Sequence, residues 1–93
     1  MYLHLGQDIV VKLEEIIGIF DLENASIEKA TKNYLAQAQK LGMVYNVSME
    51  IPKSFIVCQN KKSKKTTVYI SQISSQTLKK RTGYIGEISN IQL

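Results

Sequence analysis

Four lysines crowd into one five-residue stretch of the chain, Lys-Lys-Ser-Lys-Lys at residues 61–65. Ammonium groups this close together attract polyanions, and phosphate is an anion that lysine binds as a point charge. The stretch lies between two segments, residues 54–58 and 66–73, that have the composition of β-strands. The pattern predicts a basic β-hairpin whose tip is a mobile arm for phosphate contact. A solvated turn that charge keeps soluble is the alternative.

Two further groups of bases lie outside this hairpin. Residues 79–81, Lys-Lys-Arg, end a segment that either Ser74 or Ser75 can cap as a short helix. Cations in a last helical turn also offset the helix dipole, which is a purely local reason for their presence. Lys53 lies in a connection between strands. The predicted phosphate-contacting residues are Lys53, Lys61, Lys62, Lys64, Lys65, Lys79, Lys80 and Arg81.

Residue types that carry catalysis are few and do not gather. His4 is the only histidine and alternates onto the polar face of the first strand, so a structural role is expected. Cys58 is the only cysteine and follows Phe-Ile-Val, as an inert core thiol would. Glu14 and Glu15 are adjacent, so in a strand they point to opposite faces and cannot pair as acid and base. We predict a non-enzymatic protein without catalytic residues, metal or cofactor.

The charge is divided unequally along the chain. Residues 1–50 carry four lysines against seven acids, a net −3, whereas residues 51–93 carry eight bases against Glu87 alone, a net +7. This asymmetry favours a polyanionic partner, and nucleic acid is the expected one.

Length and composition limit the rest. The 93 residues, of which 44 % are hydrophobic, suffice for one domain. A domain this small buries only about 60 % of its unfolded surface, so self-association is expected. The chain has no run of roughly 20 apolar residues and no signal-peptide pattern at its start. Its single cysteine suits a reducing compartment. We expect a cytoplasmic protein that binds neither a membrane nor a small-molecule substrate.

Periodicity predicts an α+β fold, a small and mostly antiparallel sheet with one long amphipathic helix packed on it and a short C-terminal helix. Strands are expected over residues 2–5 and 9–11, as one strand or two short pieces, and over residues 14–20, 43–49, 54–58 and 66–73. The strand over residues 14–20 is expected to be buried, and the strand over residues 43–49 to be half-buried. The long helix is expected to begin at Ser26 as N-cap and to end at Gly42. Its predicted buried face comprises Ile27, Ala30, Tyr34, Ala38 and Leu41.

The C-terminal region is predicted as a helix that reaches residue 81, with Leu78 as its apolar anchor and Gly83 as its stop. Residues 84–93 keep apolar side chains at roughly three-residue spacing, which fits either a weak helix or a docking strand. We therefore expect one domain over residues 1–82 and a docking tail over residues 83–93.

Four segments resemble the bacterial extracellular-matrix regulatory proteins of the RemA/RemB type, and resemble the RemB branch most. They are YLHLG at residues 2–6, IIGIFD at 16–21, PKSFIV at 52–57 and VYISQISSQTLKKR at 68–81. The resemblance covers residues 1 to about 82.

The resemblance implies a cytoplasmic Firmicute protein that promotes expression of biofilm-matrix genes. The RemA branch binds DNA as a ring-shaped oligomer of small β-rich subunits, with the duplex bent or wrapped around basic residues. RemA-type sequences place one arginine before the second core strand and paired arginines in the loop after the strand that follows the helix. The corresponding positions here are Glu15 and the segment Glu-Ile-Pro-Lys at 50–53, where Lys53 alone is basic.

The expectation is thus a non-enzymatic, homo-oligomeric transcription regulator that binds double-stranded DNA by phosphate contacts, with the lysine hairpin in place of the missing arginines. The alternative is a protein-interaction module that assembles with itself or a related regulator without binding DNA directly. The acidic first half favours this alternative.

Overall fold

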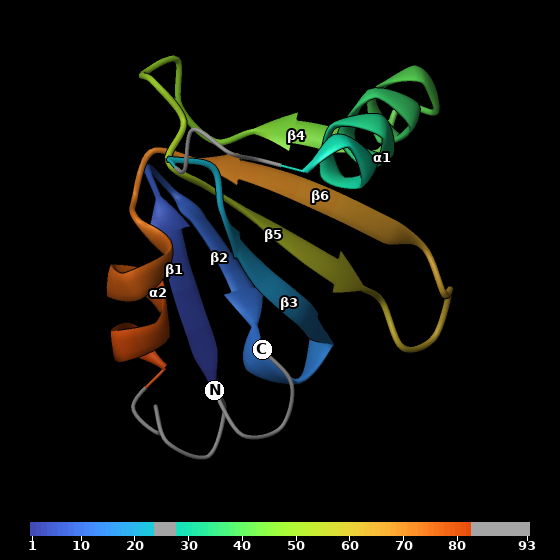
Figure 1. Cartoon of the computed structure of the whole chain (residues 1–93). Coiled ribbons are helices and arrows are strands. Elements are labelled where there is room, and N and C mark those ends of the chain that lie inside the picture. The colour runs from blue at the N-terminus through green and yellow to red at the C-terminus, as the bar shows by residue number, and fades with distance from the viewer. Residues whose placement is uncertain (24–27, 83–93) are drawn as a thin grey trace.

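A computed structural model describes residues 1–23 and 28–82, which form two β-sheets and two α-helices (Figure 1). Strands β1 (Tyr2–Gly6) and β2 (Ile9–Lys12) pair as an antiparallel hairpin. The second sheet has the order β3-β5-β6-β4. Its strands are β3 (Ile16–Asp21), β4 (Val44–Asn46), β5 (Ser54–Gln59) and β6 (Thr66–Ser71). The α+β class is as expected, but there are two sheets, and β4 pairs parallel to β6.

One face of the four-stranded sheet is covered by the β1–β2 hairpin and by helix α2 (Ser75–Arg81). The core between them joins Leu5 of β1, Ile56 of β5 and Leu78 of α2, each fully buried. Ser71 also donates a hydrogen bond of 2.7 Å to the carbonyl of Leu5, which ties the end of β6 to β1. The hairpin is therefore an integral layer of the domain.

The turn of this hairpin needs glycine. Gly6 has φ +122°, and a Cβ there would lie 2.9 Å from Oε1 of Gln72. The ring of His4 supports the same turn, because its Nε2 lies 2.6 Å from the carbonyl oxygen of Gln7. The structure thus gives the exposed His4 a contact within its own turn.

The opposite face of the sheet is covered only in part. Phe55, Val57 and Val68 form a second buried cluster there, and Ala38 is the one residue of helix α1 (Lys29–Lys40) that is buried in it. The predicted buried face of the long helix is wrong at Ala30, Tyr34 and Leu41, which lie exposed because the helix touches the sheet mainly beside the short strand β4. Their exposed fractions are 41 % for Tyr34 and 65 % for Leu41.

Helix α1 differs from expectation at its N-terminal end but not at its C-terminal end. The helix begins at Lys29, after Glu28, whose side chain makes no capping hydrogen bond. The predicted cap Ser26 and its neighbour Ile27 lie outside the described residues. At the other end Gly42 has φ +73°, as expected for a left-handed C-terminal residue.

Two predicted strands are shorter in the structure. Leu13–Glu15 form a 3₁₀ turn, so the strand expected from residue 14 begins at Ile16. The strand expected over residues 43–49 pairs only at Val44–Asn46, because the backbone then bends and the hydroxyl of Ser48 accepts a hydrogen bond from the Glu50 amide. Met49, predicted as half-buried, is 100 % exposed.

The two remaining predictions for regular structure are confirmed. β5 and β6 pair as an antiparallel hairpin, with Val57 opposite Val68. Ser74 caps α2, since its side chain accepts a hydrogen bond from the amide of Thr77. Gly83 and the tail after it lie outside the described residues. Among the described helices, none combines the length and apolarity needed to cross a membrane.

Replacement of Leu78 tests how firmly α2 holds the hairpin layer. Leu78 is fully buried, so Leu78→Ala leaves a cavity and is expected to lower the free energy of unfolding by about 2–5 kcal/mol. Gln76→Ala, at an exposed position of the same helix, is the control and is expected to change it by less than about 0.5 kcal/mol. Chemical denaturation of the three proteins measures the difference, and equal midpoints would contradict this role of α2.

Candidate nucleic-acid interface

The lysine-rich turn between β5 and β6 is organised by Asn60. The side-chain oxygen of Asn60 accepts hydrogen bonds of 2.9 Å from the amides of both Lys62 and Ser63. Its backbone closes the turn, with its amide donating to the Lys65 carbonyl and its carbonyl accepting from the Lys64 amide. The expected mobile arm is thus a hydrogen-bonded turn in which the lysines stand on a defined backbone.

All four lysines of this turn are exposed. Lys64 has φ +63°, a left-handed conformation that turns the chain back toward β6. A turn that fixes the backbone leaves less conformational entropy to be lost when the ammonium groups meet phosphates. The turn therefore offers a concentrated, partly preorganised positive charge, which suits contact with a polyanion.

A second group of bases lies on α2. Lys80 and Arg81 are exposed and Lys79 is half-buried. The guanidinium of Arg81 donates to the carbonyl oxygen of His4 at 3.4 Å, so the end of α2 is also linked to β1. Because all three bases occupy the last turn of the helix, they also face the negative end of its dipole. One hydrogen bond leaves Arg81 with further donors for a ligand.

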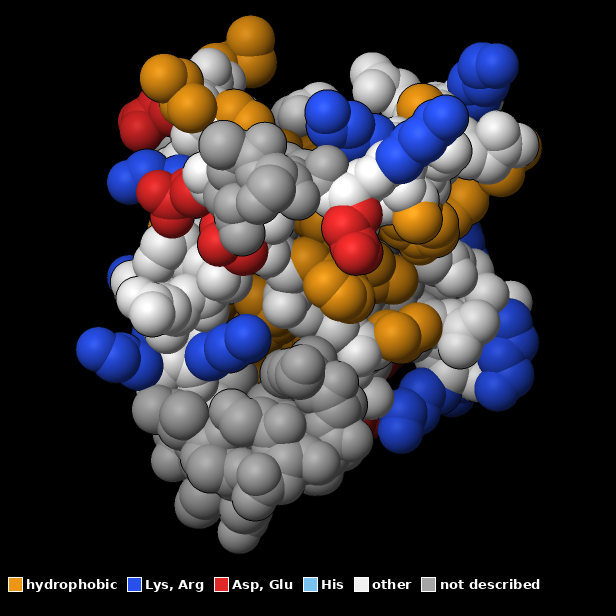
Figure 2. All heavy atoms as spheres, viewed as in Figure 1, with side chains coloured by type: hydrophobic (Ala, Val, Ile, Leu, Met, Phe, Trp, Pro, Cys, Tyr) orange, Lys and Arg blue, Asp and Glu red, His pale blue; other side chains and the backbone are white. Residues whose placement is uncertain are grey.

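The two groups lie on opposite sides of the subunit. Figure 2 shows basic side chains over α2 on the left and others at the lower right, where Figure 1 places the turn between β5 and β6. Lys53, also exposed, precedes β5, whereas the lysine turn follows it, so these two are separated by the length of that strand. The longest extent of the molecule is 33 Å. The structure thus does not gather the predicted bases into one patch.

Cys58 is held in a protonated, unreactive state. It lies in the core beside β1–β2, and burial, followed by the charge of Glu15, raises its pKa from 9.0 to about 12. Burial likewise raises the pKa of Tyr69, with smaller contributions from Cys58 and Glu15. The expectation of a buried core thiol is confirmed. Within residues 1–23 and 28–82, no group of three or more His, Cys, Asp or Glu could hold a metal ion.

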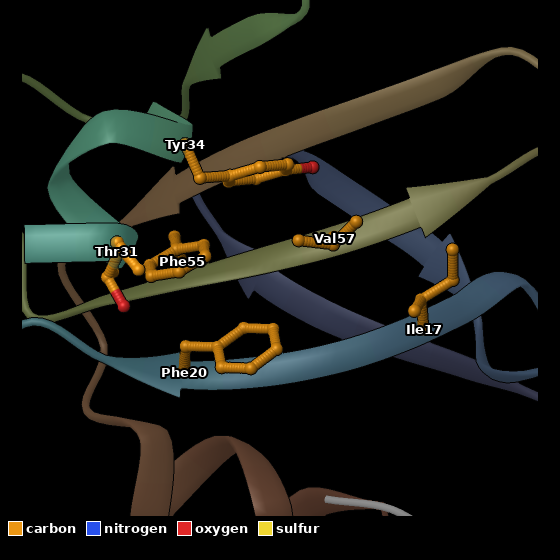
Figure 3. A pocket seen from close by; sticks show the side chains of 7 residues that line it. Ile17, Phe20, Thr31, Tyr34, Phe55 and Val57 are labelled. Carbon is orange, nitrogen blue, oxygen red and sulfur yellow. The ribbon is translucent and has the colours of Figure 1, made fainter. Parts of the chain in front are cut away.

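The sequence did not predict an open apolar groove on the α1 side of the sheet. The cavity measures about 350 Å³ and lies between α1 and strands β3 and β5 (Figure 3). We call it the apolar groove, and its lining residues are Ile17, Phe20, Ala30, Thr31, Tyr34, Phe55 and Val57.

Phe20 forms the floor of the apolar groove together with Phe55. Their rings stack with centroids 4.8 Å apart. The ring of Phe20 lies along Gly18, where a Cβ would come within 2.5 Å of it. Ile17 and Phe20 are 53 % and 44 % exposed, so the expectation that residues 16–20 form a buried strand is wrong at these two positions. The buried strand was predicted because residues 16–20 are apolar on both faces, but β3 lies at the edge of the sheet.

Comparison with known proteins identifies relatives over nearly the whole chain. The family model for RemA-like, extracellular matrix regulatory protein A-like, matches residues 2–82. Extracellular matrix regulatory protein B of Bacillus subtilis (strain 168) is 40 % identical over 91 residues, which cover 97 % of this chain and all of that protein. The resemblance inferred from the four sequence segments is confirmed.

Asn60→Ala tests the construction of the lysine turn without changing its charge. Loss of the two hydrogen bonds to the Asn60 side chain is expected to lower the free energy of unfolding by about 1–2 kcal/mol. Asn33→Ala, at an exposed site of α1, is the matched control and is expected to be neutral or slightly stabilising. Denaturation midpoints compare them, and an Asn60→Ala protein as stable as the parent would show that the turn does not need this side chain.

The buried thiol predicts a loss of stability in alkali. Above pH 9 the unfolded chain deprotonates Cys58 while the folded chain keeps the proton up to about pH 12, so folding becomes less favourable as pH rises through this window. The slope from this group approaches about 1.4 kcal/mol per pH unit. Cys58→Ala should remove that part of the slope in denaturation curves measured from pH 8 to 11. An unchanged slope in the variant would contradict the assignment.

Proposed function

Since the chain belongs to the family of extracellular matrix regulatory protein A-like proteins, we propose that it is a homo-oligomeric, non-enzymatic regulator of biofilm-matrix genes that binds double-stranded DNA in the cytoplasm. The proposed contacts to phosphate come from the bases of the lysine turn, of α2 and from Lys53. Membership of the family supports a regulatory role for the chain. DNA binding and self-association are proposed here in addition to that role.

The observation that carries the proposal is the hydrogen-bonded lysine turn. Four exposed lysines extend from a five-residue stretch whose backbone Asn60 organises. A cation group with this density has a strong affinity for the phosphate backbone and little means of reading bases. Specificity would then depend on the shape and deformability of the DNA or on a second regulator.

The separation of the bases supports the proposed assembly. One subunit presents the lysine turn and α2 on different sides, so a single copy brings few of its cations to one stretch of duplex. Neighbouring copies that each contribute one group would multiply the contacts, and linked contacts bind far more tightly than isolated ones. A closed ring of subunits is one arrangement that repeats a contact in this way.

A second candidate is an interaction module that assembles with itself or with a related regulator and leaves DNA to its partner. The apolar groove favours it, because Ile17, Phe20 and Tyr34 are all more than 40 % exposed around a cavity with little polar surface. Glu15 also stands where RemA-type sequences place an arginine, and in the segment 50–53, which corresponds to their paired arginines, Lys53 alone is basic.

A salt titration with duplex DNA separates these two candidates. Neutralisation of about five phosphates per binding unit predicts a log-log slope of affinity against salt near −4 to −5. Replacing Lys61, Lys62 and Lys64 by Gln should reduce the magnitude of the slope by about 3. Replacing Lys29, Lys32 and Lys40 of α1 by Gln removes the same charge and is expected to leave the slope nearly unchanged.

Two results would contradict DNA binding by these residues. One is the absence of binding at low salt by a folded, oligomeric parent protein, which would favour the interaction module. The other is an equal loss of affinity in both triple variants, which would show that net charge rather than the lysine turn drives the interaction.

A further inference from the structure

The connection between β4 and β5 carries two large apolar side chains into solvent. Met49 is 100 % exposed and Ile51 is 83 % exposed. We call residues 48–52 the apolar loop. Figure 1 shows it projecting beyond the sheet at the upper left, and Figure 2 shows hydrophobic side chains standing at that corner of the surface.

The apolar loop is anchored at both ends. The amide of Val47 donates to the carbonyl of Ile70 at 2.9 Å, and the amide of Lys53 donates to the carbonyl of Ser71 at 2.8 Å. The carbonyl of Lys53 also accepts a hydrogen bond from Leu22 of the segment after β3. Within the loop, Ser48 accepts from the Glu50 amide. Two apolar side chains on an anchored protrusion form a shape that can insert into a cavity.

The apolar groove is the complementary surface on the same chain. Its volume of about 350 Å³ corresponds to roughly a dozen water molecules, which gives room for more than one aliphatic side chain. None of its seven lining residues is charged.

The loop and the groove of one subunit do not meet. Met49 is fully exposed in its own chain, and no residue of the apolar loop lines the groove. A contact of groove to groove would leave Met49 and Ile51 in water. A contact of the loop with the groove of another copy covers both apolar surfaces at once.

We propose that Met49 and Ile51 of one subunit insert into the apolar groove of a second copy of the same chain. This inference rests on the self-association included in the proposed function and names the surfaces that carry it. Because the donating and accepting surfaces differ, the interface is heterologous, and an open assembly keeps one free groove at one end and one free loop at the other until it closes.

Complementation of two inactive interfaces tests the proposal. The full-length chain with Met49→Asp and Ile51→Asp keeps its groove but loses its loop, whereas Ile17→Asp loses the groove and keeps the loop. Light scattering should find the parent as an oligomer and each variant alone at the mass of one subunit, 10.5 kDa. An equimolar mixture of the two variants should form a complex of twice that mass and grow no further. Glu50→Gln is the control within the loop and should assemble like the parent.

Circular dichroism establishes that each variant is folded. Tyr34→Asp, on the exposed side of α1, provides a second groove variant should Ile17→Asp unfold. The proposal is wrong if the folded variants assemble like the parent or if their mixture stays at the mass of one subunit; an oligomeric parent would then retain self-association through another surface. A parent protein that remains a single subunit at about 100 μM would overturn both this interface and the self-association of the proposed function. The salt titration described above tests DNA binding independently of this interface.

Discussion

The burial of β5 on both faces is the constraint on which the rest of the structure depends. Residues 54–58 are all buried, so each face of the sheet must receive a covering layer. Ile56 and Cys58 face the hairpin and α2, while Phe55 and Val57 face α1. The strand also separates the bases, because Lys53 precedes it and the lysine turn follows it. The position of the charge is therefore a consequence of how the core is built.

The two faces are closed to different extents. The hairpin side has a continuous core that runs from β1 through β5 to Leu78, reinforced by the hydrogen bond from Ser71 to Leu5. On the other side α1 buries only Ala38, and the apolar groove remains open beside it. A small domain often cannot cover all its apolar surface by itself. In the proposed assembly, a second subunit covers both the incomplete face and the projecting apolar loop.

Local patterns in the sequence were sufficient for some elements. The β5–β6 hairpin and the cap of α2 depend on residues close in the chain; the hairpin was predicted, and Ser74 was one of the two residues predicted for the cap. The exposure of Phe20 and Met49 was not predicted, because apolar residues at strand spacing do not indicate which face of the strand another element covers. The basic residues could be identified one by one, but their separation depends on the sheet order β3-β5-β6-β4. The apolar groove likewise joins segments that are far apart in the sequence.

The central claim is that the lysine turn and α2, rather than positive charge in general, contact DNA. Acetylation of lysines in the folded protein with and without duplex DNA, read residue by residue by mass spectrometry, tests this most directly, because the exposed lysines of α1 serve as controls in the same sample. The account predicts that DNA protects the lysines at 61, 62, 64, 65, 79 and 80, while Lys29, Lys32 and Lys40 react at the same rate as before. Equal protection of all lysines, or none at the lysine turn, would contradict it.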